Sequence, residues 1–423
     1  MVHRIDQNPR MPLGRRPFLA GGATTAALCG RRVNAATAEP LRIGFLTTLT
    51  GPLASGGIQM QRGLAIYLKE HGNRIAGRSV EVFTADTNGL PAMARTKTAE
   101  LAERNNVDVL VGPLSATEAL AIDDYIRAKR LPTIAVAAAE DMTQRLANPW
   151  FVRVTSSSAQ CSYPMADYAR TTLGYKRMAT LGEDNAYGQE QVAGFQRVFE
   201  EQGGRIVQKL FPALNAIDYA TYIAQIKPDL DAIYMALAGS NGFRFFKQAQ
   251  EFGFGDQVKM LGGMTMVDES LLEQMGSAAI GLVSACWYSA QLDNAANKEF
   301  VAAMKREYNA VPGFYAAASN TCMAVLDHTL RSVDGDATDR ARLMQALKAA
   351  VVPDTVRGPV RFDSYGNVVG DVYIRQVERR AGQLVNTVIK TYPDVGQFWK
   401  WNPQEFLTHP VYGRTEPPAR FLE

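Results

Sequence analysis

Residues 42–71, with the sequence RIGFLTTLTGPLASGGIQMQRGLAIYLKEH, carry the pattern from which the fold can be predicted. Residues 42–47 form a short run of β-branched and aromatic side chains, which predicts a strand. Residues 49–57 follow as a loop of glycine, proline and small residues. Apolar side chains then recur at helical spacing, as at Leu64 and Tyr67. A strand, a glycine-containing loop and an amphipathic helix in this order begin a βαβ unit.

The same alternation continues along the chain. Further strands are expected at Ser79–Thr84, Val107–Val111, Thr133–Ala137, Lys176–Leu181, Arg205–Leu210, Ala232–Leu237, Val258–Leu261 and Gly281–Cys286. Two consecutive series of similar length predict an α/β fold with two Rossmann-like lobes and parallel-type sheets. Helices at 296–308 and 315–333 have no strand between them, so we expect them to pack on a lobe already built. Residues 392–423, rich in proline and aromatic residues, are predicted to be a tail on the surface.

Residues 1–38 have the features of an export leader. Arg15-Arg16 precedes a weakly apolar run, and Ala36-Thr37-Ala38 supplies small residues for a signal peptidase. The pattern predicts a twin-arginine signal peptide and a periplasmic location. A disordered arginine-rich N-terminus is the alternative. Cys29 is not predicted to be lipidated, because a leucine precedes it.

The charge of the remaining chain argues against a nucleic-acid partner. The leader holds six arginines and one acid, which leaves 39 basic and 41 acidic side chains and a net charge of −2. A nucleic-acid-binding protein would require a basic face. Cys161, Cys286 and Cys322 lie in apolar surroundings without a CxxC pair, so we expect buried, unreactive thiols.

The sequence is poor in residues that perform chemistry. His71, His328 and His409 are scattered without metal-ligand spacing, and we expect structural roles for them. HExxH, GxSxG and Walker-type motifs are missing from the sequence. We therefore predict that the protein is not an enzyme and needs neither a cofactor nor a metal.

Loops that follow the predicted strands carry a recognisable set of residues. They are Thr50–Ala54, Val111–Ala116, the small-residue run Ala135–Ala139, and Asp184–Gly188. In this order, and over about Leu41 to Ile389, they resemble the leucine/isoleucine/valine-binding family of periplasmic proteins, the type I receptors of ABC transporters. The resemblance implies two lobes joined by three crossovers, with a small molecule trapped between them by hinge closure and a membrane permease as partner.

The resemblance also implies lobe boundaries. Residues 41–155 and 287–365 would form lobe 1, and residues 156–286 and 366–391 would form lobe 2. The later unpaired helices would belong to lobe 1. We expect a monomer.

Ligand-binding positions are carried over from the family by position. In the family, the loop after the third strand binds the ligand carboxylate through a hydroxyl and backbone amides, and here Ala116 stands at the hydroxyl position. In the family, the loop after the fourth strand offers a threonine to the ligand, and here that loop contains Ala137-Ala138 instead. Tyr187 matches the family's tyrosine that closes over the ligand. The resulting candidates are Ser55, Gly56, Leu114, Ser115, Ala116, Ala137, Ala138, Tyr187, Ala238, Met264 and Trp287.

The departures from the family bear on the ligand. Met264 stands where the family has the acid for the ligand ammonium, and Asp268 is expected to begin the next helix. Gly56 replaces an aromatic residue and would leave room for a larger ligand, while Trp287 could supply an aromatic wall or pack in the hinge. We therefore expect a polar or carboxylate ligand with an apolar or aromatic body and no free amine. A ligand-sensing regulatory subunit of the same fold, or a hydrolase with an unrecognised site, are the alternatives.

Overall fold

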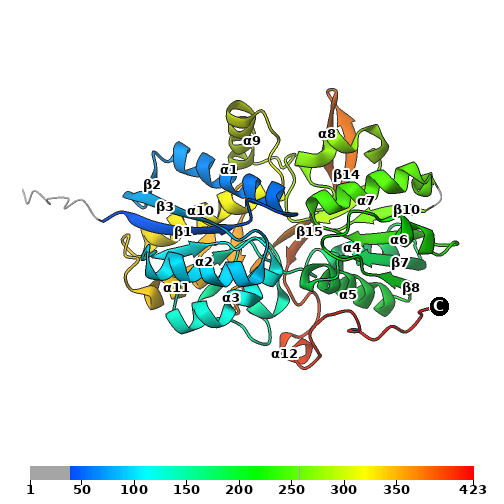
Figure 1. Cartoon of the computed structure of the whole chain (residues 1–423), viewed down its shortest axis with the longest axis horizontal. Coiled ribbons are helices and arrows are strands. Elements are labelled where there is room, and N and C mark those ends of the chain that lie inside the picture. The colour runs from blue at the N-terminus through cyan, green and yellow to red at the C-terminus, as the bar shows by residue number, and fades with distance from the viewer. Residues whose placement is uncertain (1–38, 257) are drawn as a thin grey trace, which may run out of the picture. The chain divides into compact units, whose positions relative to one another are not determined.

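The computed structural model describes residues 39–256 and 258–423. The predicted leader, its twin arginine, its cleavage site and Cys29 lie outside the described residues. The remainder forms one compact unit built from two lobes, seen side by side in Figure 1.

The first lobe is built on a sheet with the strand order β2-β3-β1-β4-β5-β6. Its strands are β1 (Leu41–Thr47), β2 (Arg74–Ile75), β3 (Arg78–Asp86), β4 (Val109–Val111), β5 (Thr133–Ala135) and β6 (Phe151–Arg153). All neighbouring strands are parallel except β2 and β3. The helices of this stretch are α1 (Ala54–Glu70), α2 (Pro91–Glu103) and α3 (Ala116–Lys129), with a short turn η1 (Glu140–Thr143).

The second lobe has the strand order β8-β7-β9-β10-β11, followed by β14 (Val368–Arg380), with which β15 (Gln383–Val395) pairs. The parallel strands are β7 (Arg177–Gly182), β8 (Arg205–Leu210), β9 (Ala232–Ala236), β10 (Lys259–Gly262) and β11 (Val283–Cys286). Its helices are α4 (Ser162–Thr171), α5 (Ala186–Glu201), α6 (Ala220–Gln225), α7 (Gly239–Glu251) and α8 (Leu272–Met275), with turns η2 (Phe254–Asp256), η3 (Glu269–Leu271) and η4 (Ser277–Ala279). The expected parallel strands are therefore present.

Helices α9 (Ala295–Tyr308), α10 (Phe314–Ser332) and α11 (Arg340–Ala349) return to the first lobe. Helix α10 packs directly along α1, where the Ser319 hydroxyl donates to the Met60 carbonyl at 2.7 Å. A Cβ atom on Gly63 of α1 would lie 2.0 Å from the Ala316 carbonyl oxygen, so glycine is required for this close approach. The prediction that these helices pack on a lobe already built agrees with this arrangement.

A long hairpin is the main feature that the sequence patterns did not predict. Strands β14 (Val368–Arg380) and β15 (Gln383–Val395) are antiparallel, and β14 also pairs antiparallel with β11. The short strands β12 (Val351–Val352) and β13 (Val360–Phe362) lead into this hairpin. Strand β15 runs to Val395, beyond residue 392 where we expected the tail to begin.

The tail after β15 follows the second lobe, as the red segment in Figure 1 shows. It contains the short helix α12 (Pro403–Phe406). The Arg145 guanidinium donates to the His409 carbonyl, and the Arg197 guanidinium stacks 3.8 Å from the centre of the Trp401 ring. The tail thus contacts residues from both lobes.

The cysteine prediction is confirmed. Cys161, Cys286 and Cys322 are free and buried, and burial raises the pKa of the Cys286 thiol to about 11. Within residues 39–256 and 258–423, no helix has the length and apolar character needed to cross a bilayer.

Candidate ligand-binding site

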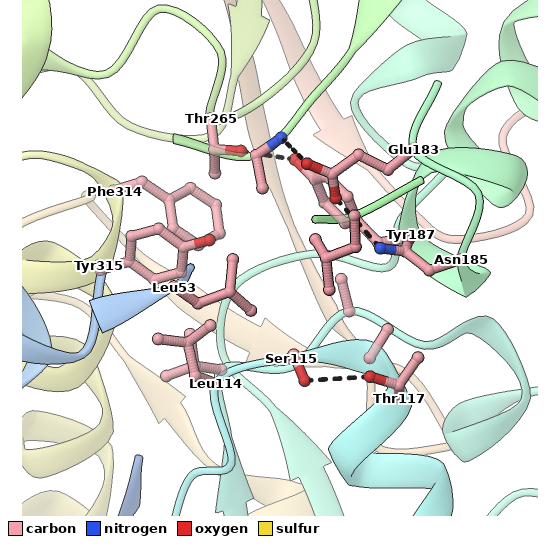
Figure 2. Close-up of a pocket in the computed structure, with 15 residues that line it drawn as sticks. Leu53, Leu114, Ser115, Thr117, Glu183, Asn185, Tyr187, Thr265, Phe314 and Tyr315 are labelled. Carbon is pink, nitrogen blue, oxygen red and sulfur yellow. Dashed lines mark hydrogen bonds between the residues drawn. The ribbon is translucent and has the colours of Figure 1, made fainter. Parts of the chain in front are cut away.

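A narrow cavity lies between the two lobes (Figure 2). The first lobe contributes Leu53, Leu114, Ser115, Ala116, Thr117, Val136, Ala138, Phe314 and Tyr315 to its lining, and the second lobe contributes Glu183, Asn185, Tyr187, Leu214, Ala238 and Thr265. These segments are far apart in the sequence and meet because loops at the carboxyl ends of parallel strands gather at one edge of each sheet.

In the described part of the chain, five long helices begin at this cavity. The residues that cap α1, α3, α5 and α7 line it, namely Leu53, Ser115, Asn185 and Ala238, and so does Phe314, the first residue of α10. Each helix N-terminus carries a partial positive charge and exposes N–H groups. The lining contains no basic side chain, and two of the five termini already donate to a carboxylate, because Glu183 accepts from the Ala238 N–H and Asp268 accepts from the Phe314 N–H.

The N-terminus of α3 has free donors that face this space. Ser115 and Glu118 form a capping box, in which the Ser115 hydroxyl accepts from the Glu118 N–H and the Glu118 carboxylate accepts from the Ser115 N–H at 2.8 Å. The next two N–H groups, those of Ala116 and Thr117, have no acceptor among the described residues. Together with the two hydroxyls they can bind an anion.

The loop that leads into α3 requires a glycine at one position. Gly112 has a φ of +114°, and a Cβ atom at this position would lie 2.0 Å from the Leu46 carbonyl oxygen. Only glycine fits here. Glu118, fully buried, accepts hydrogen bonds from the Thr48 and Thr87 hydroxyls and so holds the start of α3 against β1 and β3.

A carboxylate in the cavity lining is a feature that sequence reasoning missed. Glu183 follows β7 and is 1% exposed. Its Oε1 accepts from the Ala238 N–H and the Asn241 amide, both at 2.9 Å, and its Oε2 accepts from the Asn185 amide at 3.1 Å. Burial raises the pKa of Glu183, and these N–H donors oppose that shift. Its place directly after a predicted strand was the signal that could have identified it.

Tyr187 is the second residue of α5 and lines the cavity from the second lobe. Its hydroxyl is 2.8 Å from the hydroxyl of Thr265, which is itself buried. Burial raises the pKa of Tyr187, so its hydroxyl stays protonated at neutral pH. Tyr187 therefore offers the cavity an aromatic ring and a neutral polar group.

The aromatic wall comes from α10, which the sequence did not indicate. A Cβ atom on Gly56 would lie 2.9 Å from Cε2 of Tyr315, so Tyr315 fills the space that we expected to be open beside this glycine. Phe314 and Tyr315 pack edge to face with ring centres 4.9 Å apart. Trp287 lies behind Phe314, fully buried, with the Arg357 guanidinium 4.5 Å from its ring centre. Trp287 thus packs in the hinge region and does not line the cavity.

The structure brings together part of the predicted site. Leu114, Ser115, Ala116, Ala138, Tyr187 and Ala238 are in the lining. Ser55, Gly56, Ala137, Met264 and Trp287 are not. Ser55 is exposed near Gly239, Ala137 is buried with its carbonyl bound by Arg153, and the Met264 sulfur accepts from the Ser156 hydroxyl.

Asp268 begins a helical turn, as expected. It caps η3 through the Ser270 N–H, and its second oxygen accepts from the Phe314 N–H at 2.7 Å. Both oxygens of the Asp268 carboxylate therefore accept hydrogen bonds, and the one from Phe314 links the second lobe to α10. No cluster suited to a metal ion occurs among the residues described.

The comparisons with known proteins agree with this geometry. A family model described as periplasmic binding protein matches residues 40–383. The Leu/Ile/Val-binding protein homolog 6 of Brucella abortus (strain 2308) is 24% identical over 88% of this chain and 97% of its own length.

Solved structures match over most of the chain as well. An ABC transporter substrate-binding protein from Sphaerobacter thermophilus is 33% identical with a TM-score of 0.79, covering 85% of this chain and 99% of its own. A solute-binding protein from Rhodopseudomonas palustris BisB5, in complex with 3,4-dihydroxybenzoic acid, is 31% identical with a TM-score of 0.81, over 85% of this chain and 98% of its own. Another from R. palustris, in complex with 4-hydroxybenzoate, is 25% identical with a TM-score of 0.80, over 85% and 99%.

These matches span both lobes and include the loops around the cavity. They confirm the family and the type I fold expected from the sequence, and with them a role in binding and not in catalysis. The chain belongs to the periplasmic binding protein family and is a solute-binding protein of an ABC transporter.

Proposed function

We propose that this protein captures a small aromatic carboxylate between its lobes and presents it to the permease of an ABC importer. The observation that carries the proposal is the convergence of five helix N-termini on a cavity with apolar and aromatic walls, within the described residues. Relatives whose structures contain hydroxybenzoates support the same ligand class.

A carboxylate suits the start of α3. The free N–H groups of Ala116 and Thr117 and the hydroxyls of Ser115 and Thr117 supply donors to its oxygens. Hydrogen bonds to a charged group contribute about 1.5–3 kcal/mol each. The ligand carboxylate would also be stabilised by the helix dipoles, for which no side-chain cation is needed.

An aromatic ring suits the walls. Leu53, Leu114 and Val136 line one side, and Tyr315 and Phe314 add aromatic faces. Apolar walls with a few convergent polar groups are the usual composition of small-molecule sites. Aromatic pairs contribute about 0.5–1.5 kcal/mol beyond the area that they bury.

Capture would follow from hinge closure. Residues 41–155 with 287–365 would move as one lobe and residues 156–286 with 366–391 as the other, around the three crossovers. Contacts across the cleft, such as Gln59 to Ser270 at 2.8 Å, favour the closed arrangement that the permease would recognise.

Export by the twin-arginine route is a further part of the proposal. It rests on Arg15-Arg16 and on the small residues that end at Ala38. A reporter fused after residue 38 should reach the periplasm, and replacing both arginines by lysine should stop it. Unchanged export of the lysine variant would show that another route is used.

Ligand binding can be tested with a panel of benzoate, hydroxybenzoates, leucine and valine in calorimetric titrations and thermal-shift assays. Aromatic carboxylates should bind and raise the melting temperature, and the branched amino acids should have little effect. Strong stabilisation by leucine or valine, with none by the aromatic acids, would overturn the proposal.

A backbone variant tests the carboxylate site specifically. Ala116→Pro removes one N–H at the first position of α3, where proline is well tolerated, and Ser115 already has an extended backbone. We expect an affinity loss of about 10- to 100-fold, the equivalent of one charge-assisted hydrogen bond. Ala295→Pro, at the same position of the remote helix α9, is the matched control and should bind normally. An unchanged affinity for Ala116→Pro would place the carboxylate elsewhere.

A further inference from the structure

Glu183 is a buried carboxylate at the opposite side of the cavity from the α3 terminus. Figure 2 shows Ser115 and Thr117 on one side and Glu183 on the other. The two sides also belong to different lobes, because Ser115 follows β4 and Glu183 follows β7. A ligand held by both would have to span the cavity.

Glu183 retains capacity to accept another hydrogen bond. Its Oε1 has two N–H partners, whereas its Oε2 has one, the Asn185 amide, within the described residues. A carboxylate oxygen can accept about two hydrogen bonds. No salt bridge to Glu183 forms in the part of the chain that the structure describes. A buried carboxylate without a cation gains from every additional donor.

We infer that Glu183 accepts a hydrogen bond from a ring hydroxyl of the ligand, so that the protein selects aromatic carboxylates hydroxylated at the 3- or 4-position. This inference rests on the proposed function. A hydroxyl at the 2-position lies beside the carboxylate and cannot reach the opposite lobe. The ligand then joins the two lobes, with its carboxylate on α3 and its hydroxyl on Glu183.

The same geometry disfavours an α-amino acid. Its ammonium and carboxylate are attached to one carbon, so they cannot reach Glu183 and the α3 terminus together. A benzene ring holds a carboxylate and a 3- or 4-hydroxyl apart, so such a ligand can present them to opposite sides of the cavity. Glu183 therefore adds a carboxylate to the site, but it does not replace the acid that binds the ligand ammonium in the family, at whose position this chain has Met264.

The test compares ligands within each protein variant. Wild-type protein should bind 3- or 4-hydroxybenzoate at least about 10-fold more tightly than benzoate, 2-hydroxybenzoate or 4-methoxybenzoate, as expected for one hydrogen bond to a charged group. In Glu183→Gln this preference should fall to about 3-fold or less, whatever the change in benzoate affinity. The ratio isolates the hydroxyl contact from any general effect on the cavity.

A second variant allows the test to be made even if Glu183→Gln misfolds. In Glu183→Gln the new amide would face the Asn185 amide, donor to donor. The double variant Glu183→Gln/Asn185→Asp reverses this hydrogen bond, and the aspartate introduced by the second substitution can still cap α5 through the Gly188 N–H. The double variant should fold, bind benzoate and lack the hydroxyl preference.

The possible outcomes separate the two proposals. Equal binding of benzoate and hydroxybenzoates by wild-type protein, or an undiminished preference in both variants, would overturn the role of Glu183 and leave the aromatic-carboxylate proposal intact. Failure of every aromatic carboxylate to bind would overturn both.

Discussion

The Ser240 hydroxyl donates a hydrogen bond of 3.1 Å to the backbone carbonyl of Pro52. This contact connects the start of α7 in the second lobe to the loop before α1 in the first lobe. It lies at the rim of the cavity, beside Leu53 and Ala238 of the lining. The hinge opening that we propose would separate these two residues, so we expect the contact to stabilise the closed form specifically.

Replacing Ser240 should therefore weaken ligand capture without affecting either lobe. Ser240→Ala removes one partly exposed hydrogen bond, which contributes about 0.5–1.5 kcal/mol. The affinity should fall about 2- to 10-fold, mainly through faster dissociation, while the melting temperature of ligand-free protein stays unchanged. Stopped-flow kinetics measure the change. Ser277→Ala, at an exposed serine of the same lobe, is the control and should behave like wild type.

Tyr187 is expected to contribute to binding mainly through its ring. Tyr187→Ala removes an aromatic surface from the cavity and should lower affinity more than about 10-fold. Tyr187→Phe removes only the hydroxyl that pairs with Thr265 and should lower it about 3-fold or less. Titration calorimetry compares them with Tyr222→Ala on α6, which should bind normally. Equal losses for the alanine and phenylalanine variants would assign the contribution to the hydroxyl.

The buried pair Glu140 and Glu190 should make stability depend on pH. Glu190 accepts from the Glu140 N–H at 3.3 and 3.4 Å, and burial followed by the Glu140 charge raises its pKa. A raised pKa means that the folded state holds a proton that the unfolded state releases, so stability falls as pH rises from the ordinary glutamate pKa through the raised one. Glu190→Gln stays neutral and should lose the part of this dependence that comes from Glu190.

The measurement is the melting temperature as a function of pH. Glu190→Gln should melt above wild type in mildly alkaline buffer, and the difference should shrink as the pH falls toward about 4.5, the unperturbed range. Glu251→Gln, at an exposed position on α7, is the matched control and should follow the wild-type curve. A constant difference at all pH values would show that Glu190 is not the titrating group.

Arg145 should fasten the tail to the first lobe. Its Nε donates to the His409 carbonyl at 2.7 Å and its Nη2 to the Pro410 carbonyl at 3.0 Å, while Asp141 holds the guanidinium at 3.3 Å. Arg145→Ala should lower the free energy of unfolding by about 1–3 kcal/mol in urea denaturation. Arg95→Ala, an exposed arginine on α2, should change it by less than about 0.5 kcal/mol. An equal effect of both variants would exclude a specific role for the tail contacts.

The alternation of strands and helices and the division into two lobes could be predicted from the amino-acid sequence alone. Strand and helix periodicities depend on residues a few positions apart, so their pattern is visible in the chain. Six of the proposed site positions, at 114–116, 138, 187 and 238, line the cavity. They lie in the loops and helix starts that follow the strands of a parallel sheet, and these gather at one edge of the sheet.

The side chains that surround those positions could be identified only from the folded structure. Tyr315 fills the space beside Gly56, Trp287 packs behind Phe314, and Glu183 enters the lining through contacts with Ala238 and Asn241. The pairing of β14 with β11 could not be predicted from a local pattern, because it brings together residues about 90 positions apart. Such contacts depend on how whole elements pack, and packing is specified by the complete arrangement of side chains and not by any local pattern.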